Sequence, residues 1–87
     1  MSENLKDIFI KGYWDEENIM FYFHFQNNEA VRQIENHRDK AIYLTTENPF
    51  NAESILYDKS FEDMETDKLD FITQEEFETE WRKQFVP

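Results

Sequence analysis

The sequence contains no cysteine, a single glycine and only two prolines among its 87 residues. Because cysteine is absent, disulfide bonds and zinc–thiolate sites are excluded, and an apolar core alone must stabilise the fold. The absence also suits a reducing compartment, so we expect the protein to be cytoplasmic. No segment approaches the roughly 18 apolar residues of a membrane-spanning helix, and the first residues lack the cationic and apolar regions of a signal peptide. We therefore expect neither membrane insertion nor export by a signal peptide.

Basic side chains are also scarce, since nine Lys and Arg stand against twenty Asp and Glu, for a formal net charge of −11. Binding to DNA or RNA requires a basic surface, and binding to anionic lipid requires clustered Lys and Arg. Both classes of ligand are therefore excluded. This charge and a mean hydropathy of −0.88 are typical of disordered chains. However, the chain also contains nine Phe, four Tyr and two Trp. Burial of these large apolar side chains can offset the conformational entropy that is lost on folding, which predicts one folded domain over residues 1–87.

The first half of the chain reads as four strands, over 7–14, 19–26, 31–37 and 41–46. Short connections between them predict an antiparallel meander, because parallel neighbours need long crossovers. The second strand alternates strictly between two faces. One face carries Ile19, Phe21, Phe23 and Phe25, and the other carries Met20, Tyr22, His24 and Gln26. The register of the third strand stays open, since Val31 and Ile34 have opposite parity.

The end of the chain predicts a helix from about residue 74 to residue 85. Thr73 and Glu76 fit a capping box, and Ile72 and Phe77 complete a hydrophobic staple. Glu78 is placed to pair with Arg82 one turn later. One apolar stripe, expected to face the sheet, recurs every four residues. Its members are Phe77, Trp81 and Phe85.

The predicted fold is therefore α+β: a four-stranded, mostly antiparallel sheet (7–46), a long acidic connection (47–72) and a C-terminal helix (73–87) on one face. In the connection, Ser60 is placed to cap one short helical turn. Five apolar residues of the connection indicate that it lies against the domain; they are Ile55, Leu56, Tyr57, Phe61 and Met64. The expected core comprises Ile19, Phe21, Phe23, Phe25, Ile42, Leu44, Phe77, Trp81 and Phe85.

The sequence offers little that could carry catalysis. Its only histidines are His24 and His37, and no serine or threonine lies in a nucleophile context. The string from His37 to Asp39 matches a kinase catalytic fragment, but the chain lacks the remaining kinase elements, so we interpret it as a hairpin turn. We expect no catalytic residue, no metal and no cofactor, and hence no enzyme. His24 and Tyr22 are expected on an exposed sheet surface, where they could contact a partner.

The acidity is concentrated in the second half of the chain. Residues 1–46 carry five basic and eight acidic side chains, whereas residues 47–87 carry four and twelve. The densest run comprises Asp58, Glu62, Asp63, Glu65, Asp67 and Asp70. Its spacing does not fit a calcium loop, which also needs a central glycine. It is either a solvated loop or, with Tyr57 nearby, a negative surface held against a basic protein.

Three strings resemble a family of small acidic bacterial proteins that is largely uncharacterised. They are the strand Ile10-Lys-Gly-Tyr-Trp14, the hairpin Val31-Arg-Gln-Ile-Glu-Asn-His-Arg-Asp-Lys40 and the helix Ile72-Thr-Gln-Glu-Glu-Phe-Glu-Thr-Glu-Trp81. The chain departs from the family at Lys40, where a glycine is usual, and in 47–57, where a glycine-rich loop is replaced. The turn at Asp39 must then be of another type or longer.

The resemblance supports a fold and, by similarity of type, implies an immunity partner of a secreted bacterial toxin. The hypothesis is an immunity protein that neutralises a basic toxin, most concretely a nuclease, through an acidic surface. Nuclease toxins bind a polyanion, so an acidic inhibitor is steered to them. Two alternatives stay open: a nucleic-acid mimic that inhibits a defence nuclease of a host or phage, and a regulatory or structural binding module. A monomer is slightly favoured.

Overall fold

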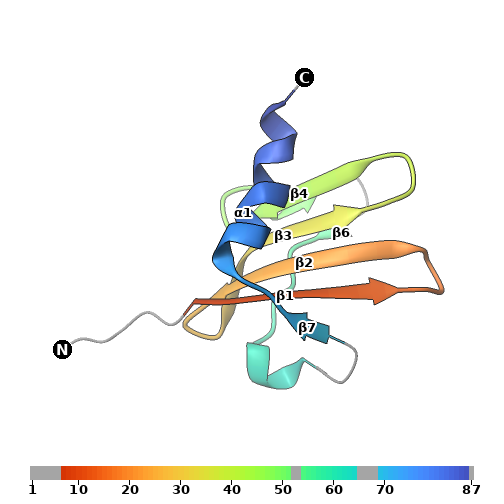
Figure 1. Cartoon of the computed structure of the whole chain (residues 1–87). Helices are drawn as coiled ribbons and strands as arrows, with labels where there is room; N and C mark the ends of the chain where they lie inside the picture. Colours follow the sequence, from red (N-terminus) through yellow and green to blue (C-terminus); the bar gives the residue numbers. More distant parts are fainter. Residues whose placement is uncertain (1–6, 52–53, 65–68, 87) are drawn as a thin grey trace.

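The computed structural model describes residues 7–51, 54–64 and 69–86 (Figure 1). Its regular elements are the strands β1 Asp7–Trp14, β2 Ile19–Gln26, β3 Glu29–Asn36, β4 Ala41–Thr45, β5 Phe50–Asn51, β6 Ser54–Ile55 and β7 Leu69–Phe71, the α-helix α1 Gln74–Trp81, and the 3₁₀ turns η1 Phe61–Asp63 and η2 Arg82–Phe85.

The main sheet has the order β4-β3-β2-β1-β7, with every neighbouring pair antiparallel. The predicted α+β fold with a meander sheet and a C-terminal helix is confirmed. The sheet gains a fifth strand, β7, from what was predicted to be connection. Lys11 faces Asp70 across the β1–β7 pair, and the Ile72 N–H donates to the Phe9 carbonyl at 2.8 Å. The chain thus pairs with the free edge of β1 just before it enters α1.

The tight hairpins form without glycine. Asn27 and Asn28, between β2 and β3, both have positive φ angles, 54° and 74°, as a type I′ turn requires. Asparagine tolerates this left-handed region better than most residues. The β3–β4 turn is longer and closes with a bond from the His37 N–H to the Lys40 carbonyl at 2.8 Å. No residue of this turn has a positive φ, so Lys40 adopts a conformation that does not require glycine.

A β-bulge settles the register that the sequence left open. His24 pairs with Arg32, whereas the next residue, Phe25, pairs with Ala30. Val31 is therefore the extra residue of β3. Beyond the bulge, Ile34 lies on the same face as His24, where it is fully buried.

Each face of the sheet is covered by a different part of the chain (Figure 1). The stripe face, which carries Phe23 and Phe25, packs against residues 54–64, here called the covering segment. The helix face packs against α1: Phe77, fully buried, lies in one cluster with Phe9 and Tyr22. Residues 54–64 of the connection thus lie against the domain, as predicted.

The predicted core implied that the helix packs on the phenylalanine stripe. It packs instead on the opposite face of the sheet. Of the nine predicted core residues, six are buried and two are half-buried. Phe85 is 71% exposed, so its place in the core was wrongly predicted. The α-helix ends at Trp81 and continues as η2, and this change of pitch turns the i+8 position away from the sheet.

The helix begins partly as predicted. The Thr73 hydroxyl accepts from the Glu76 N–H at 3.1 Å, and Ile72 joins the cluster around Phe77. The Glu76 carboxylate, expected to return to the cap, instead accepts from Lys11 Nζ at 3.0 Å. The 3₁₀ turn η1 follows Ser60 as predicted, but the Ser60 side chain makes no capping bond to a backbone N–H. Its hydroxyl instead donates to Asp63 Oδ2 at 3.2 Å.

Candidate partner-binding surface

The structure divides the predicted partner-binding residues among several places. Asp58, Glu62 and Asp63 are exposed on the covering segment, and Tyr57 is half-buried beside them. Asp70 is exposed on β7, but it pairs with Lys11 and so lies on the helix face, apart from that group. Glu65 and Asp67 lie outside the described residues. The remaining acidic surface consists of Asp58, Glu62 and Asp63.

Tyr22 and His24 were expected on an exposed sheet surface, and this expectation was wrong. They are only 8% and 7% exposed, because α1 covers them. The alternation along β2 gave the correct face, but it could not tell that the helix covers this face.

A buried polar network fixes the start of the covering segment to β3. Gln33 and Glu35 are 3% and 7% exposed on the stripe face, where apolar residues would be usual. Gln33 Oε1 accepts from the Tyr57 N–H at 2.8 Å, and Gln33 Nε2 donates to Glu35 Oε2 at 2.9 Å. Glu35 Oε1 accepts from the Ser54 hydroxyl at 2.7 Å and contacts His37 Nε2 at 3.2 Å. These bonds position the segment in one register.

Aromatic packing holds the rest of the covering segment. The Tyr57 ring packs edge-on against Phe23 and Phe25, and the Phe61 ring lies 5.2 Å from that of Phe25. Burial raises the pKa of the Tyr57 phenol, and the charges of Asp63 and then Asp58 raise it further. The two carboxylates are thus carried on an anchored frame, in contrast to those of a freely solvated loop.

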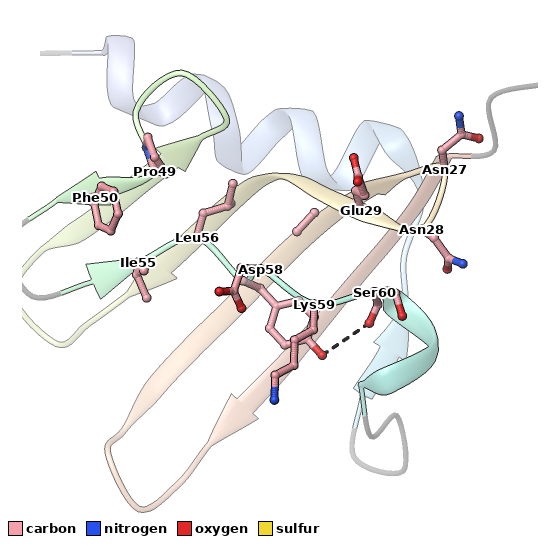
Figure 2. A pocket seen from close by; sticks show the side chains of 12 residues that line it. Asn27, Asn28, Glu29, Pro49, Phe50, Ile55, Leu56, Asp58, Lys59 and Ser60 are labelled. Atoms are coloured by element: carbon pink, nitrogen blue, oxygen red, sulfur yellow. Dashed lines mark hydrogen bonds between the residues drawn. The ribbon is translucent and has the colours of Figure 1, made fainter.

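A groove of about 530 Å³ lies beside the acidic surface (Figure 2). Its apolar end is formed by Pro49, Phe50, Ile55 and Leu56, and its polar end by Asn27, Asn28, Glu29 and Ser60. Asp58 and Lys59 lie between the two ends. We call this hollow the binding groove.

The sequence analysis did not identify Phe50 as a groove residue, and it wrongly predicted that Ile55 packs against the domain. Phe50 is 70% exposed, and Ile55, predicted to pack inward, is 52% exposed. The two residues pair across the short β5–β6 ladder. The available signal was an aromatic residue directly after Pro49, in a stretch otherwise rich in polar residues.

A second exposed apolar area lies at the β1–β2 hairpin. Tyr13 and Trp14 are 51% and 47% exposed and line a smaller hollow of about 210 Å³. The turn that follows is exposed and acidic. It contains Asp15, Glu16 and Glu17.

On the helix face, four polar side chains form a continuous chain from β1 to α1. His24 Nε2 lies 2.8 Å from Asp7 Oδ1, and Arg32 Nε donates to His24 Nδ1 at 3.0 Å. Because Nδ1 accepts, the imidazole proton resides on Nε2 and is donated to Asp7. Arg32 also forms two bonds to Glu78, at 3.2 and 2.6 Å. Glu78 thus pairs with Arg32 on β3. The predicted pair with Arg82 does not form.

These contacts shift the pKa values of three of the four side chains. Burial lowers the pKa of His24, against the opposing hydrogen bond to Asp7. The hydrogen bond from His24 lowers the pKa of Asp7, and that from Arg32 lowers the pKa of Glu78. The Arg32 guanidinium also lies 4.8 Å from the centre of the Phe77 ring and 5.1 Å from that of Trp81. Every member has a structural partner, so the arrangement serves to join sheet and helix.

Within residues 7–51, 54–64 and 69–86, no group of three or more His, Cys, Asp or Glu side chains is arranged to hold a metal ion. In the same part of the chain, no helix has the length and apolar character needed to cross a membrane.

No family model matches the chain, and no match was found among curated proteins or among solved structures. The resemblance to small acidic bacterial proteins therefore stays a prediction.

Proposed function

We propose that this protein is a stoichiometric binding protein that captures a basic partner protein. Most concretely, it is an immunity protein that neutralises a basic bacterial toxin of the nuclease class. The observation that carries the proposal is the anchored acidic surface. Asp58, Glu62 and Asp63 are exposed on a segment held to the sheet by buried hydrogen bonds and aromatic packing.

Anchoring matters because a surface that is already ordered loses less conformational entropy on binding. A net charge of −11 adds long-range attraction to any basic surface, and such steering accelerates association. A standard interface of about 800 Å² per partner would occupy roughly one eighth of the 6236 Å² surface.

The target chemistry favours a nuclease. A nuclease binds phosphates through cationic side chains, and carboxylates on a fixed frame can occupy the same positions. The inhibitor then acts either on the active site or on a neighbouring basic surface. In both cases inhibition requires one inhibitor molecule for each enzyme molecule.

The test is capture by the immobilised full chain from its native cell, followed by purification of the captured protein. We expect a basic protein whose association rate falls about tenfold between about 50 and about 500 mM NaCl. Its cleavage of plasmid DNA or of RNA should stop at an equimolar amount of this chain. A captured protein without nuclease activity contradicts the nuclease assignment, and association that is independent of salt contradicts charge steering.

Two triple charge reversals locate the surface. The variant Asp58→Lys, Glu62→Lys and Asp63→Lys should weaken binding at least about a hundredfold, since several interface charges become repulsive. The control reverses three exposed carboxylates in the β1–β2 turn, and so changes the net charge equally; it is Asp15→Lys, Glu16→Lys and Glu17→Lys. If the control weakens binding more than the first variant does, the surface has been placed wrongly.

A further inference from the structure

The binding groove has a shape and charge that point to a particular kind of ligand. We propose that it seats one large apolar side chain of the partner, and that Asp58 binds an Arg or Lys next to that side chain in the partner's sequence. This inference rests on the proposed function, because it names the element of the basic partner that the chain recognises.

The apolar end of the groove is built to receive a side chain. Phe50 and Ile55 are 70% and 52% exposed, although both are large and apolar. Two buried residues line the same hollow: Leu56, which is 8% exposed, and Ala30, which is 5% exposed. An aromatic side chain buries about 150–250 Å² when it is enclosed, and a hollow of about 530 Å³ accommodates one.

The walls of the groove are held by bonds that do not depend on a ligand. The Leu56 N–H donates to the Pro49 carbonyl at 2.8 Å, and the Phe61 N–H donates to the Asn28 carbonyl at 2.9 Å. Between these points, the Tyr57 N–H donates to Gln33. The groove is therefore preformed, which reduces the entropy lost when a ligand enters.

Charge selects what lies next to the apolar side chain. Asp58 is exposed and follows Ile55 by three residues, so their Cα atoms are at most about 11 Å apart. Neighbouring side chains of one partner segment span such a distance. Lys59 also lines the groove, but Figure 2 shows its side chain extending away from the apolar end. Glu29 adds a second carboxylate at the polar end.

A second copy of this chain is a poor occupant. Each copy carries a net charge of −11, and like-charged molecules of this size repel one another. A basic partner is attracted by the same charge. Charge complementarity therefore favours an apolar residue with a cationic neighbour over self-association.

The test uses the full chain labelled with ¹⁵N and a small probe, acetyl-Phe-Arg-amide, followed by ¹H–¹⁵N correlation spectra. We expect saturable shifts of the amides of Ala30, Leu56 and Asp58, with a dissociation constant of about 1 mM. Acetyl-Phe-Glu-amide and acetyl-Gly-Arg-amide should each bind at least about tenfold more weakly. Equal binding of the Arg and Glu probes, or shifts concentrated elsewhere, would overturn the proposal. Shifts that depend on protein concentration without probe would overturn it in favour of a second copy.

Matched variants distinguish binding in the groove from non-specific binding to exposed apolar side chains. The double variant Phe50→Ala and Ile55→Ala should abolish the shifts, whereas Phe85→Ala and Val86→Ala should not. The control pair is also an aromatic and an aliphatic residue, 71% and 67% exposed. The spectra of the free variants show directly whether each remains folded.

The probe experiment and the capture experiment fail separately. Absence of shifts in the groove, with the captured partner still bound through the acidic surface, overturns the groove alone. Groove binding without any basic partner in the cell overturns the proposed function and leaves the groove as a site for another cationic ligand. A further variant, Asp58→Asn, is compared with the unchanged chain using acetyl-Phe-Arg-amide and its neutral analogue acetyl-Phe-Gln-amide. The unchanged chain should prefer the Arg probe and the variant should lose this preference; a preference that persists contradicts the role of Asp58.

Discussion

The Arg32–Glu78 pair provides the sharpest test of how the helix is fixed to the sheet. Arg32 is 20% and Glu78 26% exposed at the side chain, and their shortest contact is 2.6 Å. In Arg32→Met, the apolar stem is retained but the charged hydrogen bonds are lost, at about 1.5–3 kcal/mol. Stacking over Phe77 and Trp81 adds about 1 kcal/mol. We expect a total loss of about 3 kcal/mol, out of roughly 4–13 kcal/mol for a chain of this length.

The assay is urea unfolding at about pH 7, followed by far-ultraviolet circular dichroism, because Trp81 contacts Arg32 and its fluorescence would change for local reasons. A cycle with Glu78→Gln should give a coupling free energy of about 1.5 kcal/mol. The matched control is Arg82→Met, on η2. Its coupling with Glu78→Gln should not exceed about 0.5 kcal/mol, the usual value of an i,i+4 pair. Equal coupling in the two cycles would refute the assignment of Glu78 to β3.

Two further predictions concern pH and the helix core. Burial holds the pKa of His24 below its ordinary value of 6.5, so at mildly acidic pH the unfolded chain binds a proton that the folded chain does not bind. The pKa of Asp7 is also lowered, but from 3.8, so its effect on stability lies at more acidic pH, outside the range in which His24 acts. The free energy of unfolding should therefore fall from about pH 7 to about pH 5. In urea unfolding at several pH values, His24→Gln should reduce this dependence of stability on pH. An unchanged dependence would exclude His24 as its source. Phe77→Ala should lower the free energy of unfolding by about 3–5 kcal/mol, because the ring is fully buried. Phe85→Ala should change it by less than about 0.5 kcal/mol. Similar losses in thermal or urea unfolding would contradict the burial of Phe77 and the exposure of Phe85.

Much of the fold could be predicted because local patterns suffice for it. The alternation of β2 over Ile19–Gln26 and the capping residues before α1 act within a few residues of chain. The bulge at Val31 could not be predicted, since it depends on which residues of two strands meet. The short strand β7 is similar: three residues give a weak local signal, and only the free edge of β1 makes them a strand.

The candidate site was predicted less completely for the same physical reason. The run of carboxylates indicated an acidic surface, but pairing with Lys11 places Asp70 on the other face of the sheet. Exposure of Phe50 and burial of His24 are consequences of how distant segments pack. A hydrophobicity pattern reports that a residue is apolar, and it does not report what covers it.

The sequence by itself determined the fold class, the four-strand meander, the start of the C-terminal helix and the net charge of −11, because these depend on composition and on neighbours along the chain. Only the tertiary structure decided which face of the sheet the helix covers, since both faces are apolar enough to be buried. It also decided that the opposite face is closed by residues 54–64, bonded to Gln33 and Glu35. That packing creates the binding groove beside Asp58, which no local pattern contains.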